Sequence, residues 1–222
     1  TGRSATKWPH LHFEIRDPYQ NPLNPFKLGY KINDRFAPVI KSVSFSPLDY
    51  NSTVENDYKP VILNTKRISR GKYIVPAMVR VWGKIGMGVS TYDMDGNVSN
   101  KFEPYFIDFY VDAKKVFAVK YDKFSFAETR MITLDRDFRL LKRGFGVYNR
   151  LYREAGNTLN FYEGFKMYDG VIPAYLSEHN GIGEGIHSFK IIVGDAFGNI
   201  SVCTGKFIVK NDEEQTIFSS VE

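Results

Sequence analysis

Two similar turn motifs divide much of this sequence into apolar segments of strand length. The motifs are Asp-Met-Asp-Gly-Asn at residues 93–97 and Asp-Ala-Phe-Gly-Asn at residues 195–199, and each follows one apolar run and precedes another. Gly and Asn are the residues that most readily adopt the positive φ angles of tight turns between strands. A chain divided in this way favours short strands joined by turns, and it predicts an all-β fold.

The apolar runs themselves have the length and alternation of β-strands. Residues 39–45 and 188–193 alternate in the manner of a strand with one buried face. The aromatic share of 15%, with 14 Tyr and 18 Phe, also favours strands, because flat rings pack well on a pleated surface. We therefore predict strands at residues 39–45, 78–81, 88–92, 105–111, 116–121 and 188–193. Regular short strands with such turns are typical of a β-sandwich.

The stretch around residues 122–185 departs from this pattern. Residues 128–142 are less strand-like and are expected to form a short helix or an irregular insertion. The Gly-rich residues 180–185 are expected to form a loop, since their glycines do not follow a strand in a phosphate-binding layout. We therefore expect one sandwich with this stretch inserted between its strands.

Composition and charge exclude several classes of protein. Hydrophobic residues make up 43% and charged residues 25%, as in ordinary globular domains. The formal net charge of +5 favours adsorption to anionic polymers, but scattered Lys and Arg residues do not indicate a nucleic-acid partner. The single cysteine, Cys203, excludes an intrachain disulfide and is expected to be a small packed side chain. No stretch is long and apolar enough to span a membrane.

Two histidines near the start of the chain are the strongest candidates for chemistry. Residues 10–16 alternate as a strand does, which places His10, His12, Glu14 and Arg16 on one face. Side chains two residues apart on a strand point the same way, with Cα atoms about 6.5–7 Å apart. Two imidazoles at this spacing can address one metal ion, or one can bind it while the other acts on the metal-bound water. The alternative is a pair of solvent-exposed histidines on a polar face.

The residues around these histidines resemble one end of a known enzyme family. Thr-Gly-Arg-Ser at residues 1–4, Pro-His-Leu-His-Phe-Glu at residues 9–14 and Asn-Pro-Leu at residues 21–23 are similar to the C-terminal end of the lysostaphin-type (LytM-type) zinc metallopeptidases. The resemblance covers residues 1–28. Residues 5–8 make the link between the Ser and the Pro longer than is usual in that family.

The resemblance implies roles for individual residues. It implies that His12 is a zinc ligand and that His10 is the catalytic histidine, acting on the attacking water or the transition-state oxyanion. Glu14 shares their face and is expected to be a solvated carboxylate; the alternative is a hydrogen-bonding partner of a metal ligand. The other two zinc ligands of the family, a His and an Asp, are expected upstream of this chain. Since a catalytic zinc needs three protein ligands and a water, the chain is expected to supply part of a site. His179 and His187 are expected to be surface or packing residues.

Residues 93–97 also resemble the start of a calcium-binding loop. The twelve-residue loop requires Gly at its sixth position and a bidentate Glu at its twelfth. Val98 and Pro104 stand at those positions here. A turn without calcium is therefore expected.

A second resemblance concerns several later segments of the chain. Ala-Pro-Val-Ile at residues 37–40 and the two Gly-Asn turns look like the extracellular immunoglobulin-like domains of bacteria. The organisation implied is a C-terminal fragment of a zinc peptidase domain at 1–33, an immunoglobulin-like β-sandwich at 34–211 with an insertion near 122–185, and a polar tail at 212–222. The fold class expected is thus all-β, the end of an antiparallel-β peptidase domain followed by a sandwich.

Together these resemblances imply an enzyme. The full-length protein is expected to be a zinc-dependent metalloendopeptidase that hydrolyses the peptide cross-links of bacterial peptidoglycan, with Zn²⁺ as cofactor and this chain alone incomplete and inactive. The sandwich is expected to contact a cell-wall polymer or a protein. A wall substrate requires export, so a periplasmic or extracellular location is expected. The alternatives are a non-enzymatic wall-binding or regulatory protein with a degenerate peptidase fold, and an adhesive sandwich whose first strands are a remnant.

Overall fold

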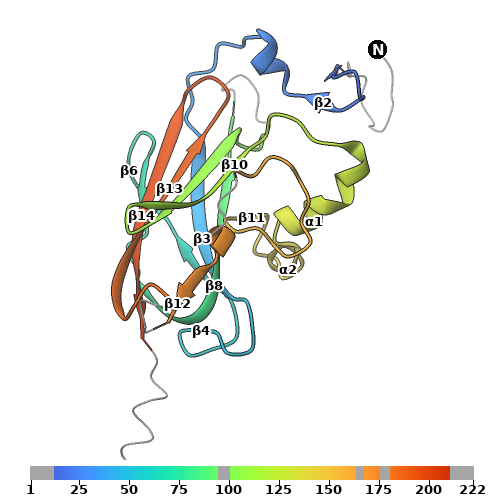
Figure 1. Ribbon diagram of the computed structural model, residues 1–222. Helices are drawn as coiled ribbons and strands as arrows, with labels where there is room; N and C mark the ends of the chain where they lie inside the picture. The colour runs from blue at the N-terminus through green and yellow to red at the C-terminus, as the bar shows by residue number, and fades with distance from the viewer. Residues whose placement is uncertain (1–12, 95–100, 164–167, 176–180, 211–222) are drawn as a thin grey trace, which may run out of the picture.

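The computed structural model describes residues 13–94, 101–163, 168–175 and 181–210, and strands dominate it, in agreement with the predicted all-β class (Figure 1). The strands are β1 (Ile15–Arg16), β2 (Pro22–Leu23), β3 (Val39–Pro47), β4 (Thr53–Val54), β5 (Val61–Asn64), β6 (Lys66–Ser69), β7 (Lys72–Ile74), β8 (Val79–Tyr92), β9 (Phe106–Val111), β10 (Lys114–Lys120), β11 (Asn149–Arg150), β12 (Ile172–Ala174), β13 (Gly185–Gly194) and β14 (Ile200–Val209). The helical segments are the 3-10 helices η1 (Pro25–Leu28), η2 (Phe126–Met131) and η3 (Tyr168–Gly170) and the α-helices α1 (Ile132–Asp135) and α2 (Phe138–Lys142). Among the described residues, no helix has the length and apolar character needed to cross a membrane.

Strand β8 pairs with two different sets of strands. Its first residues lie parallel to β14, and its later residues pair antiparallel with β3. Gly83 lies between these two parts and has a φ of +84°. A Cβ atom at Gly83 would lie 2.5 Å from Oγ of Ser52 and 2.8 Å from the backbone oxygen of Asn51. Glycine therefore lets β8 pass from one set of strands to the other.

The strands form a sandwich-like arrangement around a shared core. The hydrogen-bonded path is β10-β9-β13-β14-β8-β3-β5. Phe45 of β3 packs against Phe189 of β13 and Phe207 of β14, with ring centroids 5.8 and 6.0 Å apart. All three rings are buried. These contacts place β3 across the core from β13 and β14, and burial of such rings is the main stabilising term.

Most of the predicted strands are confirmed, at β3, β9, β10 and β13. The prediction of separate strands at 78–81 and 88–92 is wrong, because both belong to β8. Glycines within β8 allow close packing of neighbouring side chains. A Cβ atom at Gly86 would meet the ring of Tyr152, and one at Gly88 would lie 2.6 Å from Oγ of Ser44.

The connection from β10 to β13 contains most of the helical structure. Residues 128–142, predicted as a helix or an irregular insertion, form parts of η2 and the helices α1 and α2. The short strands β11 and β12 from the same connection pair antiparallel with β8. Figure 1 shows α1 and α2 close to β11. The connection therefore adds two short strands to the part of the sheet that contains β3 and β8.

The segment before β3 lies across the end of the molecule where β13 joins β14 (Figure 1). The backbone N–H of Asn24 donates to the backbone oxygen of Asp122 at 2.8 Å, and the ring of Phe26 packs on Phe197 at 4.7 Å. Of the strand predicted at 10–16, the described part begins at Phe13, and β1 covers its last two residues. The domain boundary between residues 33 and 34 stays a prediction.

Candidate functional site

The residues predicted to handle zinc, His10 and His12, lie outside the described residues, so their roles stay predictions. Glu14, expected on the same strand face, forms an ion pair with Arg16. The guanidinium carbon of Arg16 lies 5.0 Å from the centroid of the Phe126 ring. Glu14 is only half-buried, which agrees with a carboxylate that keeps access to solvent.

His187 lies in a structural environment on β13. Its Nδ1 is 2.5 Å from Oδ2 of Asp112, and its Nε2 is 3.1 Å from the backbone oxygen of Gly183. Burial acts to raise the pKa of Asp112, but hydrogen bonds from His187 and Ser188 outweigh it, so this pKa is lowered. Because both ring nitrogens have protein partners, His187 does not supply a missing zinc ligand. His179 lies outside the described residues.

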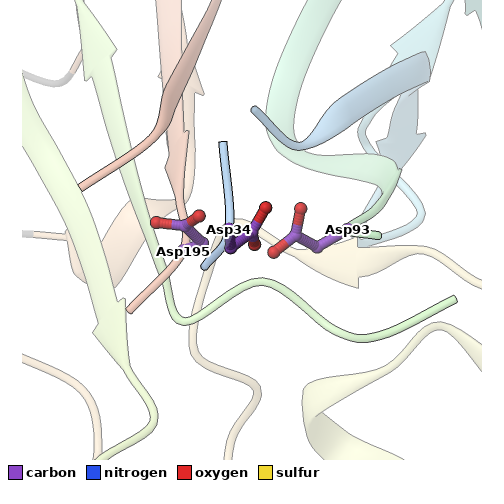
Figure 2. Close-up of side chains that lie close together, drawn as sticks. All are labelled: Asp34, Asp93 and Asp195. Atoms are coloured by element: carbon purple, nitrogen blue, oxygen red, sulfur yellow. The ribbon is translucent and has the colours of Figure 1, made fainter. Parts of the chain in front are cut away.

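Within the described part of the chain, one group of side chains has the spacing of possible metal ligands. It consists of Asp34, Asp93 and Asp195, and one carboxylate oxygen of each lies within 4.8 Å of the other two. We call these residues the aspartate group, and Figure 2 shows Asp34 between the other two. Zinc sites in proteins usually include His or Cys ligands, whereas oxygen ligands alone suit harder cations. The aspartate group therefore does not fit the missing half of a zinc site.

Each member of the aspartate group comes from a different part of the chain. Asp93 directly follows β8, Asp195 directly follows β13, and Asp34 lies in the segment that leads to β3. Asp93 and Asp195 are 7% and 4% exposed, and Asp34 is half-buried. Asp93 and Asp195 are the first residues of the two turn motifs predicted from the sequence; the turn after Asp195 is described, whereas residues 95–97 of the other motif lie outside the described residues.

The turn between β13 and β14 holds Asp195 in a fixed orientation. Its Oδ1 accepts hydrogen bonds from the backbone N–H groups of Phe197 and Asn199, both at 2.8 Å. Its Oδ2 accepts from Nδ2 of Asn199 at 2.6 Å. Gly198 has a φ of +93°, as predicted for this turn. The buried carboxylate is thus oriented by three donors from its own turn.

The same arrangement occurs once more near the start of the described chain. Oδ1 of Asp17 accepts from the backbone N–H groups of Tyr19 and Asn21, both at 2.9 Å, and its Oδ2 accepts from Nδ2 of Asn21 at 3.0 Å. Asp17 and Asp195 therefore have matching local geometry, but Asp17 does not belong to the aspartate group.

The aspartate group lies in the wall of a cavity of about 590 Å³. A volume of this size is typical of small-molecule sites, which span about 300–1,000 Å³. The wall comes from the segment before β3, the ends of β8 and β10, residues 102–105 before β9, the η2–α1 region, residues 159 and 161, and the β13–β14 turn. It is formed by Asn24, Phe26, Ile32, Asp34, Asp93, Phe102, Glu103, Pro104, Tyr105, Tyr121, Phe124, Glu128, Thr129, Ile132, Arg136, Leu159, Phe161, Asp195, Ala196 and Phe197.

Aromatic rings form much of this wall. Tyr121 and Phe161 pack edge to face with centroids 4.9 Å apart, and Phe26 packs in the same way on Phe197. The hydroxyl of Tyr105 donates to Asp122. The pKa of Tyr105 is raised, mainly by burial and secondly by this hydrogen bond. The wall is therefore mainly apolar, and its aromatic rings offer faces and edges to a ligand.

A second charged region of the wall is centred on Arg136. Its guanidinium forms ion pairs with the carboxylates of Asp135 and Glu103, the latter at 3.3 Å, and it donates to the hydroxyl of Tyr121 at 3.0 Å. Burial raises the pKa of Tyr121, although the positive charge of Arg136 acts to lower it. The charge of Arg136 is thus matched by two neighbouring carboxylates.

Sequence reasoning did not identify this cavity. It interpreted residues 93–97 as a turn and did not consider Asp34. A usable signal was present, since residues 93–97 and 195–199 both begin with Asp and both end an apolar strand. Turns that lie at the same end of a sandwich can bring such residues together, but the turn motifs do not specify which end each turn occupies.

Comparisons with known proteins do not assign the chain to a family. No protein-family description, curated protein or solved structure matches it.

Proposed function

We propose that this chain belongs to an exported bacterial zinc-dependent endopeptidase that hydrolyses the peptide cross-links of peptidoglycan. The observation that carries the proposal is the Pro-His-Leu-His-Phe-Glu sequence at residues 9–14, flanked by Thr-Gly-Arg-Ser and by Asn-Pro-Leu. In this proposal His12 holds the metal, together with ligands from a preceding region of the protein. Zinc, when bound, lowers the pKa of its water to about 7 and provides a nucleophile at neutral pH. His10 moves a proton to or from the reacting oxygen.

The all-β part of the chain has a supporting role in this proposal. We assign it as an immunoglobulin-like sandwich that holds the enzyme at the wall through a polymer or protein contact. The mild positive charge of the chain, +5, supports adsorption to anionic wall polymers. A non-enzymatic wall-binding function is the second candidate, and the cavity of about 590 Å³ favours it, because it offers a binding site independent of zinc.

The test requires the protein extended upstream to include a complete peptidase domain. Bound zinc is measured by elemental analysis, and cleavage is measured on purified peptidoglycan. We expect one zinc per chain and cleavage that His12→Ala abolishes. His179→Ala serves as the control, because the resemblance gives His179 no role. A protein that binds no zinc, or whose cleavage survives His12→Ala, would exclude the peptidase proposal and leave the wall-binding candidate.

A further inference from the structure

The wall of the cavity between the segment before β3 and the β13–β14 turn is acidic, whereas the chain as a whole is basic. Within the described residues, its lining includes five carboxylates, those of the aspartate group together with Glu103 and Glu128, and one guanidinium, that of Arg136. Arg136 is already matched by Asp135 and Glu103. The wall is therefore acidic, although the whole chain has a formal net charge of +5. Charge complementarity favours a cationic occupant.

The spacing of the aspartate group suits an ammonium. Hydrogen bonds from an ammonium to carboxylate oxygens measure about 2.8 Å. If the nitrogen lies at the centre of a triangle of three oxygens, each about 2.8 Å away, the oxygens are separated by up to roughly 4.8 Å. The ligand oxygens of Asp34, Asp93 and Asp195 lie within 4.8 Å of one another. A single ammonium can therefore reach all three.

The rest of the cavity is too large and too apolar for a cation alone. Phe26, Phe161 and Phe197 contribute rings to the wall, and Leu159 and Ile132 contribute aliphatic side chains. An ion would leave most of the volume of about 590 Å³ in contact only with these groups. An apolar body attached to the ammonium would bury that surface and gain the corresponding hydrophobic free energy.

We infer that this cavity binds a small organic amine, with its ammonium at the aspartate group and its apolar body against the phenyl rings. The inference does not depend on zinc or on the proposed peptidase activity. It rests on three features of the described residues, namely a cavity of ligand size, an acidic group at one place in its wall and aromatic side chains over the remainder.

The first experiment compares ligands of one shape and different charge on the full 222-residue chain. Isothermal titration calorimetry is carried out with 4-phenylbutylamine, 4-phenylbutanol and 4-phenylbutyrate, and separately with calcium and magnesium chloride. We expect the amine to bind about tenfold or more tightly than the alcohol, because it adds charge-assisted hydrogen bonds, and the carboxylate to show no binding. Equal binding of amine and alcohol, or binding of a divalent cation with none of the amine, would overturn the inference.

The second experiment locates the ammonium. Asp195→Asn removes a negative charge but keeps a side-chain oxygen for the backbone donors of the turn, and Asp34→Asn removes a charge from a second part of the wall. Each is expected to weaken amine binding about tenfold and to leave binding of the alcohol unchanged. Asp17→Asn is the matched control, because Asp17 has the same turn geometry outside the cavity. An equal loss of amine binding in the Asp17→Asn control would contradict the proposed position.

A third variant separates binding in the cavity from binding elsewhere. Ala196 lies in the wall beside Asp195, and Ala196→Trp is expected to occupy the space of the apolar body and abolish binding of amine and alcohol alike. Circular dichroism tests whether each variant retains its β structure. If one variant of the turn does not fold, Asp34→Asn and the ligand series on the unchanged chain still decide between the outcomes.

Discussion

The side chain of Asn199 connects its own turn to Asp34, which lies 165 residues earlier in the chain. Its Nδ2 is 2.6 Å from Oδ2 of Asp195 and 3.2 Å from the backbone oxygen of Asp34. One amide group therefore orients a buried carboxylate and also fixes the segment that supplies another carboxylate to the same cavity.

Replacing Asn199 should weaken both the fold and the cavity. We expect Asn199→Ala to lower the free energy of unfolding by about 1–2 kcal/mol, because a buried carboxylate oxygen loses its side-chain donor. Unfolding in urea measures the change. Asn21→Ala is the control, since the amide of Asn21 makes the corresponding bond within its turn, to Asp17 at 3.0 Å, and makes none to a distant segment within the described part of the chain. A larger loss in the control than in Asn199→Ala would contradict the connecting role.

Glycine at position 83 should be required for the path of β8. Gly83→Ala combines a positive φ of +84° with a Cβ atom 2.5 Å from Oγ of Ser52. We expect it to lower the free energy of unfolding by roughly 2–4 kcal/mol through backbone strain and steric overlap. Gly144→Ala has a similar φ of +82° and no atom within 4 Å of the added Cβ, so only strain remains, and we expect about 1 kcal/mol. Similar losses in the two variants, measured by urea unfolding, would show that contact with Ser52 is unimportant.

Asp112 should contribute to stability at neutral pH and lose that contribution in acid. Its pKa is lowered in the folded chain, because hydrogen bonds from His187 and Ser188 outweigh the cost of burial. The contribution is therefore present above the unfolded pKa of about 3.9 and is lost as the pH falls through the lower folded value. We expect no more than about 1 kcal/mol, since the Asp112 side chain is 44% exposed and solvent screens its charge.

The measurement is a series of unfolding curves between pH 6 and pH 3 for the unchanged chain and for Asp112→Asn. The unchanged chain should lose more stability over this range than the variant. Identical pH dependence in the two proteins would show that the Asp112 carboxylate has the same pKa in the folded and unfolded states.

Cys203 should be unreactive while the chain is folded. It is fully buried in β14, and burial raises the pKa of its thiol to about 12. Because the thiolate is the reactive form, modification by a thiol reagent at pH 8 should be slow in buffer and rapid in denaturant. The denatured chain serves as the control, because its thiol is exposed. Rapid modification under native conditions would show that β14 opens readily or that Cys203 is accessible.

Local sequence patterns determined several strands of this protein, among them β3, β9, β10 and β13. The buried residues of β9, Ile107, Phe109 and Val111, alternate with less buried neighbours, and this alternation can be read without any knowledge of the fold. The turn at 195–199 was equally readable, because the φ of Gly198 depends on the turn itself. The proposed roles of His10 and His12 also come from the sequence alone and stay predictions.

The tertiary structure decided the path of β8 and the meeting of the three aspartates. The glycines of β8 have the same local signature whether they form a turn or allow close packing, and only the neighbouring Ser44, Ser52 and Tyr152 distinguish the two. Asp34, Asp93 and Asp195 meet because the segment before β3 lies over the β13–β14 turn. That contact depends on packing between residues far apart in the chain, and periodicity within one segment carries no information about it.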